Sequence, residues 1–139
     1  MMNQFIEFCT NHWEMVAVFV AILITLLFME RNNGAASLTS SAATTLINNE
    51  NAVLLDIRPE KEFKTGHITD SINVPATKIK DSLNRLEKHK DAPIIVVCKT
   101  GMTAGASAKD LKKAGFSKIY KLQGGIAEWQ ASNLPLVKK

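Results

Sequence analysis

The sequence predicts an α/β fold in which a parallel β-sheet is covered by helices on both faces. Two short apolar runs, residues 52–56 and 94–97, are typical of strands that are buried on both sides. Segments with helical spacing separate them, and strands that alternate with helices indicate parallel βαβ units. An uncharged run at residues 15–29 precedes this pattern and predicts a separate N-terminal element.

The apolar run at 15–29 predicts a membrane anchor formed by residues 1–31. A helix of fifteen residues is about 22 Å long, shorter than the hydrocarbon core of about 30 Å. Either extension of the helix toward His12 and Asn11 or local thinning of the bilayer is expected to close the gap. Trp13 is placed as an interfacial anchor. A cleaved signal peptide and a buried helix are the alternatives, although residues 1–14 lack the Lys or Arg of a signal peptide.

Charge is distributed unevenly along the chain. Residues 1–37 carry one basic and three acidic side chains, whereas residues 38–139 carry sixteen basic and ten acidic side chains. Arg31 follows the apolar run and no basic residue precedes it, which favours a single pass of the inner (cytoplasmic) membrane with the domain on the cytoplasmic side. The basic domain favours anionic substrates, acidic proteins or a lipid surface. Its lysines are not interleaved with aromatics, so nucleic acid is not an expected partner.

The start of the domain is predicted from small and polar residues. Residues 32–37 are typical of a linker, and residues 38–139 form the expected domain. Thr39 or Ser40 is placed to cap a helix that ends near Asn48.

Proline and glycine, which mark the ends of helices and strands, and the spacing of apolar residues predict the remaining elements. Proline favours the first turn of a helix and ends strands, glycine ends helices, and apolar residues at i, i+4 and i+7 mark a buried helix face. In chain order these signals predict a helix from Pro59 to Thr65 that stops at Gly66, a strand at 72–74 ended by Pro75, an amphipathic helix through Ile79, Leu83 and Leu86, a helix after Cys98 that ends at Gly115, a strand at 118–122, and a last helix that follows Gly124 and Gly125 and holds Trp129.

Cys98 is the candidate nucleophile. It lies between the end of a buried strand and the start of a helix, where anions bind and thiolates are stabilised. Lys99 adds a cation and Gly101 relaxes the backbone, so that several N–H groups of the loop can converge. The alternative is an inert cysteine packed at the end of the strand.

The cysteines and histidines point away from a disulfide framework and from a metal site. Cys9 and Cys98 are far apart in the sequence, which suits a reducing compartment. His12, His67 and His89 are scattered, and no CxxC motif is present. We therefore expect neither a metal nor an organic cofactor.

Six short motifs, in order, resemble the rhodanese family over roughly residues 38–137. They are Asp56-Ile57-Arg58, Glu62-Phe63, Gly66-His67-Ile68, Ile72-Asn73-Val74-Pro75, the loop from Cys98 to Thr103, and Gly124-Gly125-Ile126 with Trp129. The resemblance implies a rhodanese-like three-layer sandwich with a five-stranded parallel sheet, here preceded by an N-terminal transmembrane helix. The combination is similar to the membrane-anchored single-domain rhodaneses of bacteria.

The resemblance implies sulfur transfer. The family's cysteine takes a sulfane sulfur from a donor such as thiosulfate, holds it as a persulfide and passes it to a thiol, a protein or another thiophilic acceptor. Cys98 takes that place here. The family loop often has the pattern Cys-x-x-Gly-x-Thr, which implies that the residues after the cysteine bind substrate through the loop amides. These residues are Lys99, Thr100, Gly101, Met102 and Thr103.

Several of these loop residues have two interpretations. Lys99 either holds the anionic donor or is a solvated surface charge. Thr103 either forms a hydrogen bond with sulfur or caps the following helix. Met102 either forms an apolar lip of the pocket or touches solvent.

Three further residues are expected to support the site. Asp56 lies at the carboxyl end of a strand, where open α/β sheets place their sites. Arg58 and Glu62 are expected to pair and to fix the loop geometry. Gly66 and His67 are expected to shape a turn, with His67 as a general base the lesser alternative.

Three other functions compete with sulfur transfer. A related phosphatase needs an arginine six residues beyond the cysteine, and Ala104 occupies that position. A membrane-tethered module that docks a partner, or carries a persulfide with little thiosulfate turnover, is the main alternative. Redox sensing through Cys98 lacks a resolving cysteine within the domain.

Overall fold

The structure, a computed structural model, describes residues 1–33 and 35–138, and of residues 30–33 it describes the backbone alone. The chain divides into two compact units, residues 1–34 and 35–139. Gly34, which belongs to the expected linker, and Lys139 lie outside the described residues, as does the side chain of Arg31 on which the expected orientation rests.

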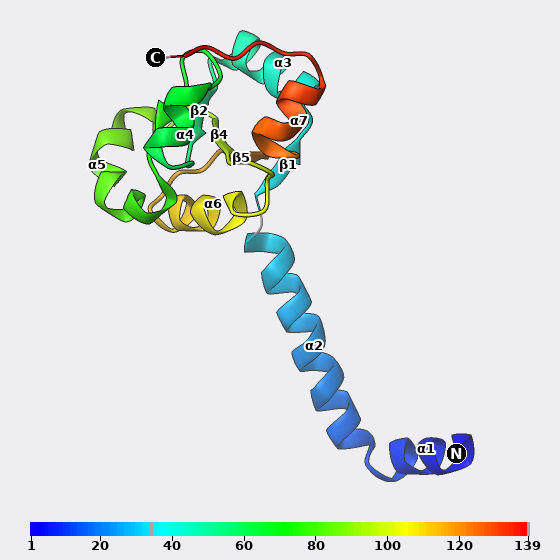
Figure 1. The fold of residues 1–139 in the computed structure, drawn as a ribbon. Coiled ribbons are helices and arrows are strands. Elements are labelled where there is room, and N and C mark those ends of the chain that lie inside the picture. The colour runs from blue at the N-terminus through cyan, green and yellow to red at the C-terminus, as the bar shows by residue number, and fades with distance from the viewer. Residues whose placement is uncertain (34, 139) are drawn as a thin grey trace. The chain divides into compact units, whose positions relative to one another are not determined.

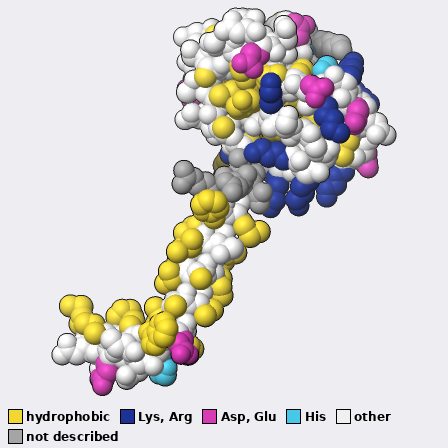
Figure 2. Space-filling view, turned by 180° about the vertical axis from the view of Figure 1, so that it is seen from behind, with side chains coloured by type: hydrophobic (Ala, Val, Ile, Leu, Met, Phe, Trp, Pro, Cys, Tyr) yellow, Lys and Arg dark blue, Asp and Glu magenta, His cyan; other side chains and the backbone are white. Residues whose placement is uncertain are grey.

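The N-terminal unit consists of two helices, α1 (Met2–Asn11) and α2 (Trp13–Asn33), and α2 contains the apolar run. Large apolar side chains are exposed along both helices, as Figure 2 shows in yellow. Among the described residues, no single helix has the length and apolarity needed to cross a bilayer. The pair Met2–Asn11 and Trp13–Met29, bent by 90°, meets that requirement by length and composition only.

The second unit is built on a five-stranded sheet in which all neighbouring strands are parallel, in the order β1-β5-β4-β2-β3. This result confirms the predicted parallel sheet (Figure 1). The strands are β1 (Ala36–Leu38), β2 (Val53–Asp56), β3 (Ile72–Asn73), β4 (Ile94–Val97) and β5 (Ile119–Leu122).

Side chains of β4 alternate between two hydrophobic clusters, one on each face of the sheet. Ile94 and Val96 belong to the first cluster, and Ile95 and Val97 belong to the second. All four side chains are buried, which explains why the strand is an unbroken β-branched run.

Helices complete the outer layers of a three-layer sandwich. The first cluster includes residues of α6 (Ala104–Lys113), and the second includes residues of α3 (Ser40–Glu50) and α7 (Gly125–Ala131). The predicted cap of α3 is confirmed, because Oγ1 of Thr39 accepts a hydrogen bond of 3.2 Å from the amide of Ala42. The predicted short helix before Gly66 is confirmed as α4 (Glu60–Thr65).

The predicted linker at 32–37 is wrong at its C-terminal end. Ala36, Ser37 and Leu38 form β1 and pair with Tyr120, Lys121 and Leu122 of β5. Ala and Ser give no apolar alternation, so the pairing rests on backbone hydrogen bonds that a side-chain pattern does not reveal.

The predicted amphipathic helix at 79–86 is also wrong as a continuous element. The segment is divided into η1 (Ala76–Lys78), η2 (Lys80–Ser82), α5 (Leu83–Leu86) and η3 (Glu87–His89). The apolar spacing was informative, because Ile79 and Leu86 are buried in the first cluster. Asp81, Ser82 and Asn84 favour local turns over a regular helix.

The strand order reverses at β2. From β2 the chain adds β3 on one side, whereas β4 and β5 lie on the other side. In open α/β sheets, ligands bind outside the carboxyl ends of the strands at such a reversal. The segments that follow β2 and β4, which begin at Ile57 and Cys98, meet at this position, because the amide of Ile57 donates to the carbonyl oxygen of Val97 at 2.9 Å.

Candidate active site

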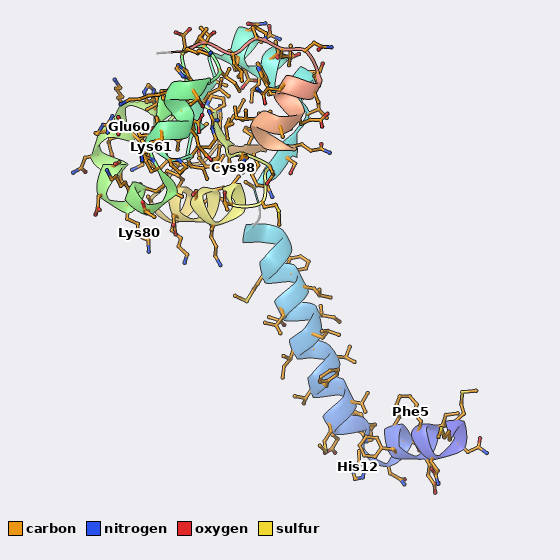
Figure 3. The ribbon with its side chains drawn as sticks, in the orientation of Figure 1. Phe5, His12, Glu60, Lys61, Lys80 and Cys98 are labelled. Carbon is orange, nitrogen blue, oxygen red and sulfur yellow. The ribbon has the colours of Figure 1, made fainter. Side chains whose placement is uncertain are left out.

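Cys98 directly follows β4 at the carboxyl edge of the sheet (Figure 3). The residue is 3% exposed, and its Sγ accepts a hydrogen bond from the amide of Gly101, with an N–S distance of 2.8 Å. Gly101 has φ of 88°, in the left-handed region, and this conformation allows the loop to fold back over the sulfur. Of the loop amides in the described part of the chain, that of Gly101 contacts the sulfur, and the convergence of several amides stays a prediction.

Residues at the N-terminus of α7 form hydrogen bonds with the backbone of the loop that begins at Cys98. The amide of Ile126 donates to the carbonyl oxygen of Cys98 at 2.9 Å, and the amide of Ala127 donates to that of Lys99 at 3.0 Å. Gly125, with φ of 59°, allows this approach, because a Cβ there would overlap the carbonyl oxygen of Cys98. Gly125, which the sequence predicts only as a residue that precedes the last helix, therefore also positions the cysteine loop.

Asp56 and Arg58 form a buried ion pair beside the loop. Nη2 of Arg58 lies 2.8 Å from Oδ2 of Asp56 and donates to the carbonyl oxygen of Gly66 at 2.7 Å. The amide of Arg58 also donates to Oδ1 of Asp56 at 3.0 Å. Among the described residues, Arg58 pairs with Asp56, so the expected pair with Glu62 is wrong. A buried guanidinium needs a buried carboxylate, whereas Glu62 is partly exposed.

A pocket of about 430 Å³ opens at Cys98. Its lining residues come from the segments that follow β2, β3 and β4. Of the predicted site residues, the pocket brings together with the cysteine Lys99, Thr103, Arg58 and Glu62. Cys98, although buried, is thus one of the lining residues of a pocket that could receive a small molecule. The pocket is also lined by Ile57, Pro59, Glu60, Pro75, Ala76, Thr77 and Lys78.

The charges around this pocket have both signs. Lys78 and Lys99 are cationic, Glu60 and Glu62 are anionic, and all four are at least partly exposed. A hydrogen bond from Lys64 lowers the pKa of Glu60, and the charges of Lys64 and Lys78 act in the same direction. Because Arg58 is neutralised by Asp56, Lys78 and Lys99 are the cations available to an incoming anion.

The remaining predicted residues lie outside this pocket. Thr100 and Met102 are exposed in the loop, and Met102 is 87% exposed, so its contact is with solvent. Thr103, by contrast, lines the pocket and stands at the N-cap of α6 without a side-chain cap hydrogen bond.

His67 joins elements away from the pocket. Its Nδ1 lies 2.8 Å from the carbonyl oxygen of Phe63, its ring stacks on that of Phe63, and its backbone pairs with Val137. These contacts agree with the expected role in shaping the chain, because the ring is buried against neighbours and away from the pocket.

Sequence reasoning missed two contributors. Asn73 donates from Nδ2 to the carbonyl oxygens of Asp56 and Arg58, at 3.1 and 2.9 Å, and so fixes the segment after β2. Lys78 lines the pocket from the segment after β3. Their positions in the sequence could have indicated a place near the site, because both residues lie at or beyond the carboxyl end of β3, and the carboxyl ends of parallel strands lie on the same side of the sheet as Cys98.

The thiol of Cys98 lies where the strand order of the parallel sheet reverses, accepts a hydrogen bond from a backbone amide, and belongs to a residue that lines a pocket with two lysines. These features define a protein that can carry out nucleophilic chemistry on small anions. The chain matches the Rhodanese-like domain over residues 39–132. It is 38% identical to the uncharacterised protein YibN of Escherichia coli K12, with 99% of each chain covered. It is 34% identical to the thiosulfate sulfurtransferase GlpE of Pseudoalteromonas translucida, over 63% of this chain and 81% of that protein.

A solved structure has the same fold. The crystal structure of a rhodanese-related protein from Thermoplasma volcanium superposes with a TM-score of 0.67 at 27% identity, and covers 75% of this chain and 99% of that one. The chain belongs to the rhodanese family.

Proposed function

We propose that the protein is a sulfurtransferase that moves a sulfane sulfur from a thiosulfate-like donor to a thiol acceptor through a persulfide on Cys98. The observation that carries this proposal is the hydrogen bond from Gly101 to Sγ of Cys98, a residue that lines a pocket together with Lys78 and Lys99. The relative named thiosulfate sulfurtransferase adds support at the level of the family.

The first half of the reaction forms the persulfide. The Cys98 thiolate attacks the outer sulfur of thiosulfate, a new S–S bond forms, and the old bond breaks with its electron pair leaving on sulfite. Lys99 and Lys78 line the pocket that receives the dianion, and the amide of Gly101 stabilises negative charge on sulfur.

The second half returns the cysteine to its starting state. The persulfide takes up a proton, and an acceptor thiolate then attacks its outer sulfur. The acceptor leaves as a hydropersulfide and Sγ leaves as the thiolate, so no external oxidant or reductant is consumed. These steps use side chains and backbone amides of the chain itself.

Turnover with thiosulfate and cyanide tests this proposal. The wild type is expected to release thiocyanate, and Cys98→Ser is expected to release none. A matched control is Ser107→Ala, which alters a buried polar side chain of α6 away from the pocket. If the wild type and Cys98→Ser release thiocyanate at the same rate, the proposal fails.

A docking module is the second candidate, favoured by the exposed side chain of Met102 on the cysteine loop. In that case the chain binds a protein partner, or delivers a persulfide to it, with little thiosulfate turnover. Partner binding that survives Cys98→Ser but is lost in Met102→Glu would favour docking over catalysis.

We further propose that the N-terminal unit is a membrane anchor of the YibN type, which makes a single pass of the inner membrane and leaves the domain in the cytoplasm. Two observations support it: the bent helix pair has the length and apolar composition of a membrane span, and the similarity to YibN covers 99% of this chain. After carbonate extraction of cells, the protein is expected to stay in the membrane pellet. Release into the supernatant would exclude the anchor.

A further inference from the structure

A second pocket, of about 580 Å³, adjoins the pocket of Cys98. Glu60, Pro75 and Lys78 line both pockets and so form a shared wall. Its other lining residues come from α4, the segment around β3 and the short helices that follow, and Arg85 is among them. The two pockets therefore lie on either side of the same three residues, close enough for one ligand to contact both.

The charges of this second pocket are predominantly positive. Its lining carries Lys64, Lys78 and Arg85 against one carboxylate, Glu60. Nζ of Lys64 lies 2.8 Å from Oε1 of Glu60, so these two charges compensate each other. Within the described part of the chain, neither Lys78 nor Arg85 forms an ion pair. The pocket thus offers a guanidinium and an ammonium to an anionic ligand.

The size and polarity of the pocket restrict the ligand class. Pockets for small organic ligands have volumes of about 300–1,000 Å³, and the second pocket falls in that range. Ser71, Asn73 and Ser82 add polar side chains to its lining. The planar fork of arginine matches a carboxylate in two-point contacts. These features fit a short polar molecule with carboxylates better than they fit cyanide or a hydrophobic group.

We propose that this pocket is the acceptor subsite and binds the carboxylates of a peptide-sized thiol, while its thiolate reaches the persulfide on Cys98. The inference rests on the proposed sulfur transfer and names the acceptor class. The acceptor RS⁻ attacks the outer sulfur of Cys98–S–SH, which gives RS–SH and the Cys98 thiolate. The proton stays on the transferred sulfur, and the electron pair of the broken S–S bond stays on Sγ.

Binding is tested first, without any chemistry. S-methylglutathione, a carboxylate-bearing peptide whose sulfur is blocked, is titrated into the full chain in detergent micelles and followed by NMR. It is expected to shift resonances around Arg85 and Lys78. Arg85→Gln is expected to weaken binding about tenfold, as loss of one charge-assisted contact does. No binding to the wild type at millimolar ligand would overturn the inference, whether or not sulfur transfer occurs.

Transfer is tested second. The wild type and Arg85→Gln are loaded with thiosulfate, freed of donor and mixed with glutathione or with uncharged dithiothreitol. Arg85→Gln is expected to raise the glutathione concentration for half-maximal transfer about tenfold, with persulfide formation and the dithiothreitol rate unchanged. Lys118→Gln, which removes an exposed cation just before β5 at the opposite edge of the sheet, is the control and is expected to change nothing.

The two possible failures are distinguishable. An equal effect of Arg85→Gln on both thiols, or no effect on either, would overturn the acceptor subsite while leaving the sulfurtransferase proposal in place. A wild type that never forms a persulfide would instead count against the proposed function, and the NMR titration would still decide whether the pocket binds carboxylates.

Discussion

The amide of Ile126 and the carbonyl oxygen of Cys98 are joined by a hydrogen bond of 2.9 Å. Through this bond, the first turn of α7 fixes the backbone of Cys98, while the amide of Gly101 donates a hydrogen bond to its sulfur. Gly125 makes the contact possible, because it has no Cβ to meet the carbonyl oxygen. The position of the cysteine therefore depends on a glycine that lies beyond the next strand in the chain.

Gly125→Ala is expected to reduce both stability and activity. The left-handed backbone costs an alanine about 1–2 kcal/mol, and the overlap with Cys98 forces the loop to move. Displacement of a reacting group lowers rates by about tenfold or more. Urea unfolding and the rate of persulfide formation measure the two effects.

Gly105→Ala is the matched control for that substitution. Gly105 lies within α6, and a Cβ there meets nothing within 4 Å. The substitution is expected to leave persulfide formation unchanged and to stabilise the domain by about 0.5–1 kcal/mol. Equal losses of activity in both glycine variants would contradict the assigned role of Gly125.

Asp56→Asn is expected to destabilise the domain strongly. The carboxylate of Asp56 is 1% exposed and is the ion-pair partner of Arg58, so its loss leaves a buried guanidinium without a counter-charge. Breaking such a pair costs about 3–5 kcal/mol. Urea unfolding measures the change. Glu87→Gln, which breaks the exposed pair with Lys90, is the control and is expected to cost about 1 kcal/mol or less.

His89 is expected to make stability depend on pH. Burial lowers the pKa of His89, the charge of Lys88 adds to the effect, and Nε2 is buried without a hydrogen-bond partner among the described residues. The unfolded chain therefore binds a proton that the folded chain resists. The free energy of unfolding is expected to be at its full value above about pH 6.5 and to fall as the pH drops below it.

His89→Gln is expected to flatten that dependence between about pH 7.5 and 5, as measured by urea unfolding at each pH. The reason is that glutamine does not titrate, so folded and unfolded chains then bind the same number of protons at this position. An equally steep loss of stability in His89→Gln would contradict the assignment.

The central part of the fold could be predicted from the sequence because both faces of β2 and β4 are buried, which leaves unbroken apolar runs. The edge strand β1 could not, because Ala36 and Ser37 contribute backbone pairing alone. The segment around Ile79 and Leu86 has helical apolar spacing, but turn-forming residues between them divide it. Spacing predicts which side chains are buried more securely than it predicts the regularity of the backbone.

The candidate site, like the fold, could be predicted from the sequence only in part. Cys98 could be singled out because it directly follows an apolar strand, but position alone left an inert packed cysteine as the alternative, and its role as a nucleophile follows from the family resemblance. The partner of Arg58 could not be predicted, since several carboxylates lie within four residues of it in the sequence, at Asp56, Glu60 and Glu62. The choice depends on burial, which places Asp56 inside and leaves Glu62 partly exposed. The contribution of Lys78 depends on chain segments that meet only after folding.

Intact-mass analysis after incubation with thiosulfate tests the central claim most directly. The wild type is expected to gain the mass of one sulfur atom, which dithiothreitol then removes, and Cys98→Ala is expected to gain nothing. Cys9, the other cysteine, remains in that variant and serves as an internal control. A wild type that stays unmodified, or a Cys98→Ala variant that still gains sulfur, would contradict the account.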